Sequence, residues 1–169
     1  MEDARIDVVV TLSAGAFYVR FHTVLYCIAM SDWNANIINE FRTKRGVGVT
    51  NFGDRLLLLN VRGAKSGQVR TIPLAFHRDG DTYVVAASKG GAPTNPDWYH
   101  SVVANPEVEV EVGSKRIKAH ARAIPQGPER DKLYGKHAEL MPGFADYETR
   151  TTRTIPVIVL EPIAELAAA

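Results

Sequence analysis

Two short basic segments with glycines hold the residue types best suited to chemistry. They span residues 63–70 and 87–99, and each follows an apolar run that predicts a β-strand. Together they place Lys65, Arg70 and Lys89 beside flexible glycines and backbone N–H groups. Cationic side chains near such N–H groups suit a ligand that carries negative charge. The sequence therefore predicts a local anion site.

Other chemical motifs are missing from the sequence. The dipeptide Lys65-Ser66 resembles the end of a phosphate-binding P-loop, but Ala64 stands where that motif needs glycine. No histidine stands at a metal-ligand spacing from another His or Cys, so no metal site is predicted. The chain also lacks a Gly-x-Ser-x-Gly elbow and a Gly-x-Gly-x-x-Gly fingerprint. These absences argue against a hydrolase of the elbow type and against a Rossmann nicotinamide site.

Length and charge limit the class of protein. A chain of 169 residues predicts one domain with a sizeable core. The net charge of +1 argues against a general nucleic-acid binder, so any basic site must be local. The single cysteine, Cys27, excludes an internal disulfide and fits a reducing cytoplasm, where we expect the protein to reside.

The elements that must position the anion site form a small α+β domain. Apolar periodicity predicts helices at residues 31–44, 96–105 and 128–140, and strands at residues 56–61, 68–78, 82–87, 108–112, 115–124 and 153–160. Pro73 predicts an edge or a bulge in the second strand. Asn95 is predicted to cap the helix that begins at Pro96. Six strands joined by short hairpins indicate a small antiparallel β-barrel.

Residues 1–29 form an unusual N-terminal extension. Arg20 and His22 interrupt its apolar runs at a high cost in a bilayer, and its acidic start is unlike a secretory signal. Three interpretations stay open: a packed helix or strand, a membrane-surface segment, or a start assigned too early. Because Met30 precedes Ser31, a favourable helix cap, we predict a functional domain at residues 30–169. We expect that domain to keep its activity without residues 1–29.

Five motifs extend the prediction beyond composition and spacing. They are residues 63–74, 86–91, 95–99, 104–108 and 153–157. In this order they resemble the deazaflavin-dependent nitroreductase family, which uses reduced coenzyme F-420 as hydride donor. The resemblance implies a split β-barrel with flanking helices, of the kind found in flavin reductases and pyridoxamine oxidases and often dimeric.

The resemblance also implies roles for individual residues. Lys65 and Arg70 would hold the phosphate and carboxylates of the coenzyme tail, and Trp98 would support the wall beside the deazaflavin ring. The implied cofactor-binding set is Lys65, Arg70, Pro73, Leu74, Ala86, Ala87, Ser88, Lys89, Gly90, Gly91 and Trp98. Many family members carry Arg at the position of Ala64, so two alternatives stay open: tail binding is weaker here, or Arg62 makes the missing contact.

The implied substrate pocket includes Met141, Phe144 and Tyr147. Their spacing of three residues by itself fits either a helix face on the core or one wall of an apolar pocket. Prodrug-activating members of the family carry several tyrosines in this region, and only Tyr147 remains here. Tyr147 and Ser88 are the predicted catalytic proton donors, with solvent as the alternative.

The predicted function is hydride transfer from reduced coenzyme F-420 to an electrophilic small molecule, either a quinone, an enone or a nitroaromatic. Two alternatives stay open. One is a non-catalytic carrier of F-420 or of a lipid-like ligand, and the other is a barrel oxidoreductase that uses FMN. A homodimer and a peripheral membrane contact through the N-terminus are both compatible with the prediction, whereas nucleic acid has no place in it.

Overall fold

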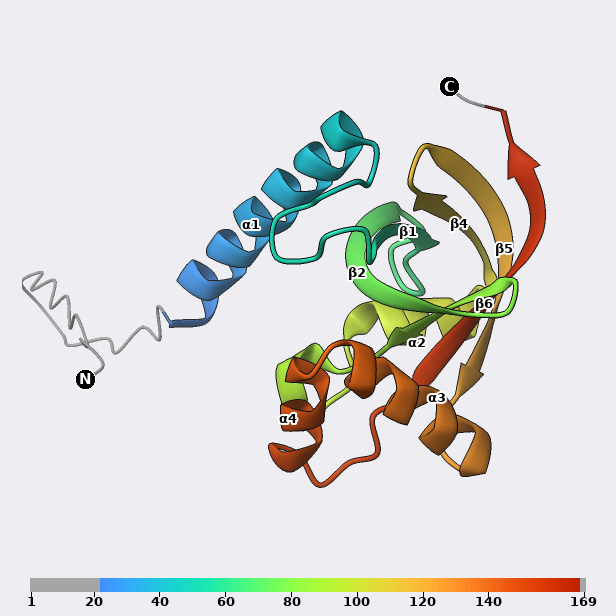
Figure 1. Cartoon of the computed structure of the whole chain (residues 1–169). Helices are drawn as coiled ribbons and strands as arrows, with labels where there is room; N and C mark the ends of the chain where they lie inside the picture. The colour runs from blue at the N-terminus through green and yellow to red at the C-terminus, as the bar shows by residue number, and fades with distance from the viewer. Residues whose placement is uncertain (1–21, 168–169) are drawn as a thin grey trace, which may run out of the picture.

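The computed structural model describes the backbone of residues 22–167 and the side chains of residues 33–167. Its six strands form a closed antiparallel barrel in the order β1-β2-β3-β6-β5-β4 (Figure 1). The strands are β1 Leu56–Arg62, β2 Val69–Asp79, β3 Thr82–Ala86, β4 Glu107–Val112, β5 Lys115–Ile124 and β6 Val157–Leu166. The helices are α1 His22–Lys44, the short 3-10 helix η1 Lys89–Gly91, α2 Asp97–Ala104, α3 Pro128–Leu140 and α4 Gly143–Thr149. The predicted α+β barrel with flanking helices is confirmed.

Strand β1 is buried on both faces, as its continuous apolar run predicts. Leu57 and Leu59 belong to the core inside the barrel, whereas Leu56 and Leu58 pack outward against Phe41 of α1. All four leucines are at most 1% exposed. Each contributes about 1.5–3 kcal/mol of burial free energy, so β1 anchors both the barrel and its outer helix.

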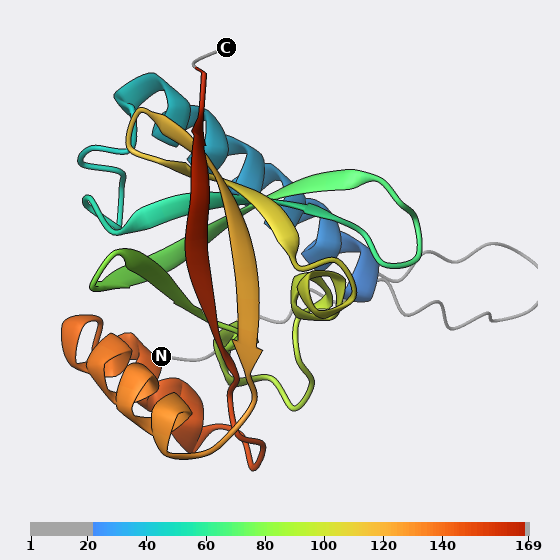
Figure 2. The ribbon, with the colours of Figure 1, turned by 90° about the vertical axis from the view of Figure 1, so that its right-hand side faces the viewer.

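The helices cover different parts of the barrel. Helix α1 lies along its outside, and α3 and α4 pack together on another side (Figures 1 and 2). Helix α2 adds Val102 to the core inside the barrel. Leu133 and Tyr134 of α3 form a second core cluster with residues of β3 and β6. These helices therefore fix the loops at the ends of β1, β3 and β6.

The start of α1 differs from the prediction. The helix begins at His22 and continues through Ser31, so Ser31 is not its N-cap. Residues 22–30 contain neither Pro nor Gly, and nothing in their sequence stops a helix. The rest of the predicted extension, residues 1–21, lies outside the described residues, and the domain start at Met30 stays a prediction. Among the described helices, none has both the length and the hydrophobicity to cross a bilayer.

Two further elements depart from the prediction. Helix α4 was only one of the two interpretations left open by the spacing of Met141, Phe144 and Tyr147, because Pro142-Gly143 favours a break at that point. The last strand begins at Val157 instead of residue 153 and continues past Pro162 to Leu166. The pairing with β5 shifts by one residue there, which leaves Ile163 without an opposite residue in the register. This bulge lets the strand accommodate a proline.

Pro73 lies where β2 has only one neighbouring strand. It is opposite Leu58 of β1, whereas β3 pairs with β2 only over the range Phe76 to Asp79. Proline has no N–H to donate, so it suits the side of β2 that lacks a strand partner. The edge predicted at Pro73 is therefore confirmed.

Candidate functional site

The unpaired side of β2 adjoins the loop that follows β3. Val85 is the last residue of β3 opposite β2, facing Phe76, and β3 ends one residue later at Ala86. The chain then leaves the sheet, and the N–H of Ala87 donates to the carbonyl of Pro156 at 2.9 Å. Within residues 22–167, residues 69–75 of β2 thus have no strand partner on the side where the loop over residues 87–96 departs.

Helix α2 connects the two basic segments. The N–H of Ala64 donates to the Ser101 hydroxyl at 3.4 Å, and the Asn105 amide donates to the carbonyl of Arg62 at 3.2 Å. The second segment leads directly into the first turn of α2 at Asp97. Because eight helical residues span about 12 Å, both segments lie along one short helix.

Lys65 and Arg70 are exposed cations without a described partner. Among the residues that the structure describes, neither side chain makes a hydrogen bond or an ion pair. Arg62 was the candidate to replace the arginine that is missing at Ala64. Its guanidinium donates instead to the carbonyl of Gly67 at 2.9 Å, which stabilises the turn that follows Arg62. Lys65 and Arg70 are consequently the cations of this segment that are free to meet an anion.

The loop after β3 has a backbone shape that suits anion binding. Ser88 is in the right-handed helical region, and Lys89, Gly90 and Gly91 follow with positive φ values of 48°, 62° and 82°. A right-handed residue followed by a left-handed one turns successive N–H groups toward one side, which forms a concavity for anions. The Lys89 ammonium group donates to the Thr94 hydroxyl at 3.1 Å. Backbone and cation therefore lie within one short loop.

Gly91 brings this loop into contact with α4. A Cβ atom at Gly91 would lie 2.8 Å from the Tyr147 carbonyl oxygen and 2.9 Å from the Arg150 Cβ. Both distances are too short for real Cβ contacts, so only glycine lets η1 approach α4 this closely. The structure thus places the predicted ring loop directly beside Tyr147, one of the predicted proton donors.

Replacing Gly91 is expected to separate these two elements. Gly91→Ala should lower the free energy of unfolding by about 1–3 kcal/mol more than Gly90→Ala, because only the former overpacks the contact with α4. Both glycines have positive φ, and a Cβ at Gly90 meets nothing within 4 Å, so Gly90→Ala controls for backbone strain. Urea unfolding of the two variants measures the difference. Equal destabilisation would show that the η1–α4 contact is loose.

The three predicted substrate residues are all half-buried, and two of them pack on the core. Phe144 and Tyr147 of α4 pack against the second core cluster, and the Phe144 ring centroid lies 4.3 Å from that of His137 and 5.2 Å from that of Tyr147. Met141 precedes α4 and caps the C-terminus of α3. The helix-face alternative therefore holds for Phe144 and Tyr147, while Tyr147, which is half-buried, also borders the loop.

Three other predicted cofactor residues take different orientations. Leu74 is opposite Leu57 and packs against the core inside the barrel, whereas Pro73 is opposite Leu58, whose side chain faces outward. Since neighbouring strand residues point to opposite faces, Pro73 and Leu74 share a backbone edge but no common face. Trp98 packs against the barrel core from α2.

Two polar residues of the loop, Asn95 and Ser88, have surroundings that the local sequence does not reveal. The predicted cap, Asn95, does not cap α2: Pro96 occupies the N-cap position, and Asn95 Oδ1 accepts a hydrogen bond from Arg153 at 2.6 Å. Ser88 is 8% exposed, and its side chain makes no capping hydrogen bond to η1. Arg153 stood in a recognised motif, but its role depends on contacts with residues about 60 positions away.

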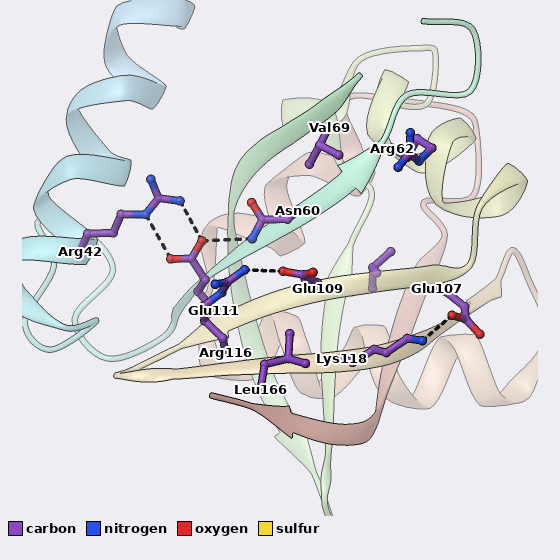
Figure 3. A pocket seen from close by; sticks show the side chains of 11 residues that line it. Arg42, Asn60, Arg62, Val69, Glu107, Glu109, Glu111, Arg116, Lys118 and Leu166 are labelled. Atoms are coloured by element: carbon purple, nitrogen blue, oxygen red, sulfur yellow. Dashed lines mark hydrogen bonds and ion pairs between the residues drawn. The ribbon is translucent and has the colours of Figure 1, made fainter. Parts of the chain in front are cut away.

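A charged cavity of about 610 Å³ lies on the outer face of the barrel and shares no residue with the predicted cofactor set (Figure 3). Three of its four cations are paired with glutamates at 2.7–2.8 Å: Arg42 with Glu111, Arg116 with Glu109 and Lys118 with Glu107. The fourth, Arg62, donates to the carbonyl of Gly67. Although burial raises it, the hydrogen bonds from Arg42 and Asn60 hold the pKa of Glu111 below its ordinary value. Because most of its cations already have a glutamate partner, this surface is a weaker candidate for an anionic ligand than the end of the barrel that carries Lys65 and Arg70.

The fold and these motifs match known proteins. The family model described as F-420H(2)-dependent quinone reductase matches residues 34–162. An F-420H(2)-dependent quinone reductase of Mycobacterium tuberculosis is 45% identical over 106 residues, which cover 62% of this chain and 71% of that protein. A solved F-420-H(2)-dependent reductase is 40% identical with a TM-score of 0.58, covering 63% of this chain and 94% of that one.

A second solved structure, described as a domain-swapped dimer, is 36% identical with a TM-score of 0.61. The match covers 78% of this chain and 99% of the chain in that structure. The family match spans most of the barrel and includes both basic segments. It agrees with the resemblance drawn from the motifs, under a quinone reductase rather than a nitroreductase description. The chain belongs to the F-420H(2)-dependent quinone reductase family, whose members are deazaflavin-dependent oxidoreductases.

Proposed function

We propose that this protein transfers a hydride from reduced coenzyme F-420 to a quinone. The observation that carries the proposal is that Lys65 and Arg70, at the barrel end where the η1 loop leaves the sheet, have no polar partner among residues 22–167. A phosphate and carboxylate tail needs such cations, because charge-assisted hydrogen bonds are the strong ones. Family membership supports the coenzyme, and the name of the matched family supports the quinone.

The residues of this region fit the coenzyme. Lys65 and Arg70 would bind its tail, and the loop from Ala86 to Gly91 would approach its ring through backbone atoms without a Cβ at the last two positions. Trp98 and Leu74, both packed on the core, would keep water from the ring. When bound, the reduced coenzyme supplies the hydride. The protein then contributes orientation and a dry surface for the acceptor.

A quinone that accepts a hydride also needs a proton to become a hydroquinone. The Tyr147 and Ser88 hydroxyls are the donors that we propose, since Gly91 places the loop of Ser88 against the backbone of Tyr147. Tyr147→Phe and Ser88→Ala should then each lower kcat by about 10- to 100-fold, the low end of general acid catalysis. Unchanged kcat in both variants would indicate proton transfer from solvent.

Turnover tests the proposed function. Purified protein is mixed anaerobically with reduced F-420 and a soluble quinone, and coenzyme oxidation is followed by absorbance against a sample without protein. Many turnovers per protein molecule are the expected result, with an enone and a nitroaromatic tested in parallel to define the acceptor range. Binding of the coenzyme without turnover on any acceptor would contradict an enzyme and favour a carrier.

Size-exclusion chromatography in the same buffer tests whether the protein forms a homodimer.

A further inference from the structure

Arg153 holds the loop after β3 by four hydrogen bonds. It lies in the connection between α4 and β6, and its side chain is partly buried. The guanidinium donates to the carbonyls of Ala92 at 2.8 Å, Ala87 at 3.1 Å and Ser88 at 2.8 Å, and to Asn95 Oδ1 at 2.6 Å. Two of these acceptors precede η1 and two follow it, so one side chain ties both ends of the loop together.

The charge of Arg153 has no acidic partner. Within the described part of the chain, all its hydrogen bonds go to neutral carbonyl and amide oxygens, and no ion pair includes it. Burial lowers the pKa of its guanidinium, which nevertheless stays protonated. Arg130, 5% exposed, instead pairs with Glu148 at 2.6 Å. A partly desolvated cation without a carboxylate is costly unless something nearby is anionic.

Arginine is suited to this position by its shape. Its planar guanidinium has five donors in a fixed fork, so it can reach carbonyls on both sides of η1 at once. A lysine has one ammonium group on a flexible stem and cannot bridge the same four acceptors. The loop it holds contains three left-handed residues, of which Gly90 and Gly91 adopt this conformation freely, whereas Lys89 has a Cβ and needs external support.

We propose that Arg153 is a positioning residue for the coenzyme. It holds residues 87–95 in the shape that presents the loop N–H groups and Lys89 to the coenzyme, and its unpaired charge adds to the field that attracts an anion. The inference rests on the proposed function. Arg153 lies in one of the five motifs, but it is not in the cofactor-binding set that the resemblance implied, and here it gains a role toward the coenzyme.

Two variants and one control test the inference. Arg153→Met keeps the length of the stem without its donors, and Arg153→Lys keeps the charge without the fork. Arg122→Met removes another arginine, paired with Glu129 and Glu161, and controls for the loss of an arginine that does not contact the loop. Amide hydrogen exchange over residues 87–95 is measured without coenzyme, and the Kd of oxidised F-420 and the kinetic constants are measured for all four proteins.

The expected pattern separates positioning from general stability. Arg153→Met should speed exchange in the loop and raise the F-420 Kd by at least about 10-fold, with Arg153→Lys intermediate and Arg122→Met unchanged. The KM for reduced F-420 should rise together with the Kd in both Arg153 variants, and kcat should fall as well, because Arg153 also holds the backbone of Ser88, one of the proposed proton donors. If Arg153→Met does not fold, loop exchange and the F-420 Kd of Arg153→Lys, compared with those of wild type and Arg122→Met, test the inference. Wild-type loop exchange and affinity in the Arg153 variants would overturn the inference, whereas a wild-type protein that binds no F-420 would overturn the proposed function itself.

Discussion

Lys65→Ala and Arg70→Ala are each expected to weaken F-420 binding by about 1–3 kcal/mol, which corresponds to about 5- to 150-fold in Kd. Both side chains are exposed and make no hydrogen bond or ion pair with the described residues, so protein stability should stay within about 0.5 kcal/mol. The loss should therefore appear in affinity alone. Fluorescence titration of oxidised F-420 measures it.

Lys132→Ala provides the matched control for this prediction. Lys132 is an exposed lysine of α3, on a different side of the barrel, and its removal changes the net charge by the same amount as removal of Lys65. Its Kd should equal that of the wild type. Added salt should weaken wild-type binding more than binding to the Lys65→Ala/Arg70→Ala double variant, since fewer charges remain to be screened. Wild-type affinity in both single variants would show that Lys65 and Arg70 do not bind the coenzyme tail.

A second large effect is expected on stability at acid pH, and it comes from two buried histidines. The Nδ1 atoms of His77 on β2 and His137 on α3 are 2.9 Å apart, and the residues are 3% and 0% exposed. Within the described chain, neither Nε2 atom has a hydrogen-bond partner. Burial lowers the pKa of His77 to about 4, helped by Lys136 and opposed by Asp79, and burial beside His77 lowers that of His137 to about 3.

The sign of the pH dependence follows from these values. Both histidines are neutral in the folded protein at pH 7, whereas in the unfolded chain they take up protons near pH 6.5. The unfolded state therefore binds more protons below pH 6.5, and stability must fall as the pH falls toward the folded pKa values. Between about pH 7.5 and about pH 5 the expected loss is about 2 kcal/mol per histidine. That range lies above the ordinary pKa of carboxyl groups, so acidic residues contribute little to it.

Urea unfolding at the two pH values checks this prediction. His137→Leu should lose roughly half of the acid sensitivity, because one of the two titrating groups is gone. His120→Gln is the control: His120 is exposed on β5, and its replacement should leave the pH dependence unchanged. A wild-type protein that is as stable at about pH 5 as at about pH 7.5 would mean that the pair is not buried as described.

Local sequence patterns were sufficient to predict the strands whose side chains alternate between buried and exposed, or are buried on both faces. Val108 and Val110 alternate with glutamates in β4, and Leu56 to Leu59 are buried on both sides of β1, as their patterns predicted. Helix α4 follows a local break signal at Pro142-Gly143, and its stability comes from Phe144 and Tyr147 packing on a core contributed by distant strands. Short helices depend on such tertiary contacts, which no local window contains.

In the candidate site, too, some residues could be predicted from local sequence, whereas other contacts could not. Lys65, Arg70 and the glycines of the second loop could be named from residue type and spacing alone. The bonds of Arg153 reach 58 to 66 residues back along the chain, and His77 and His137 are 60 residues apart. These contacts arise only when β6 brings its preceding segment to the loop and α3 packs on β2. The sequence therefore predicts which groups bind the coenzyme, and the fold shows which distant residues contact the predicted site.

Equilibrium titration of the purified protein with oxidised F-420, with FMN in parallel, tests the central claim most directly. The claim is that the barrel end with Lys65, Arg70 and the η1 loop is a site for the deazaflavin coenzyme. We predict saturable, salt-sensitive binding of F-420 and no comparable binding of FMN. Preference for FMN, or binding of neither compound, would contradict it.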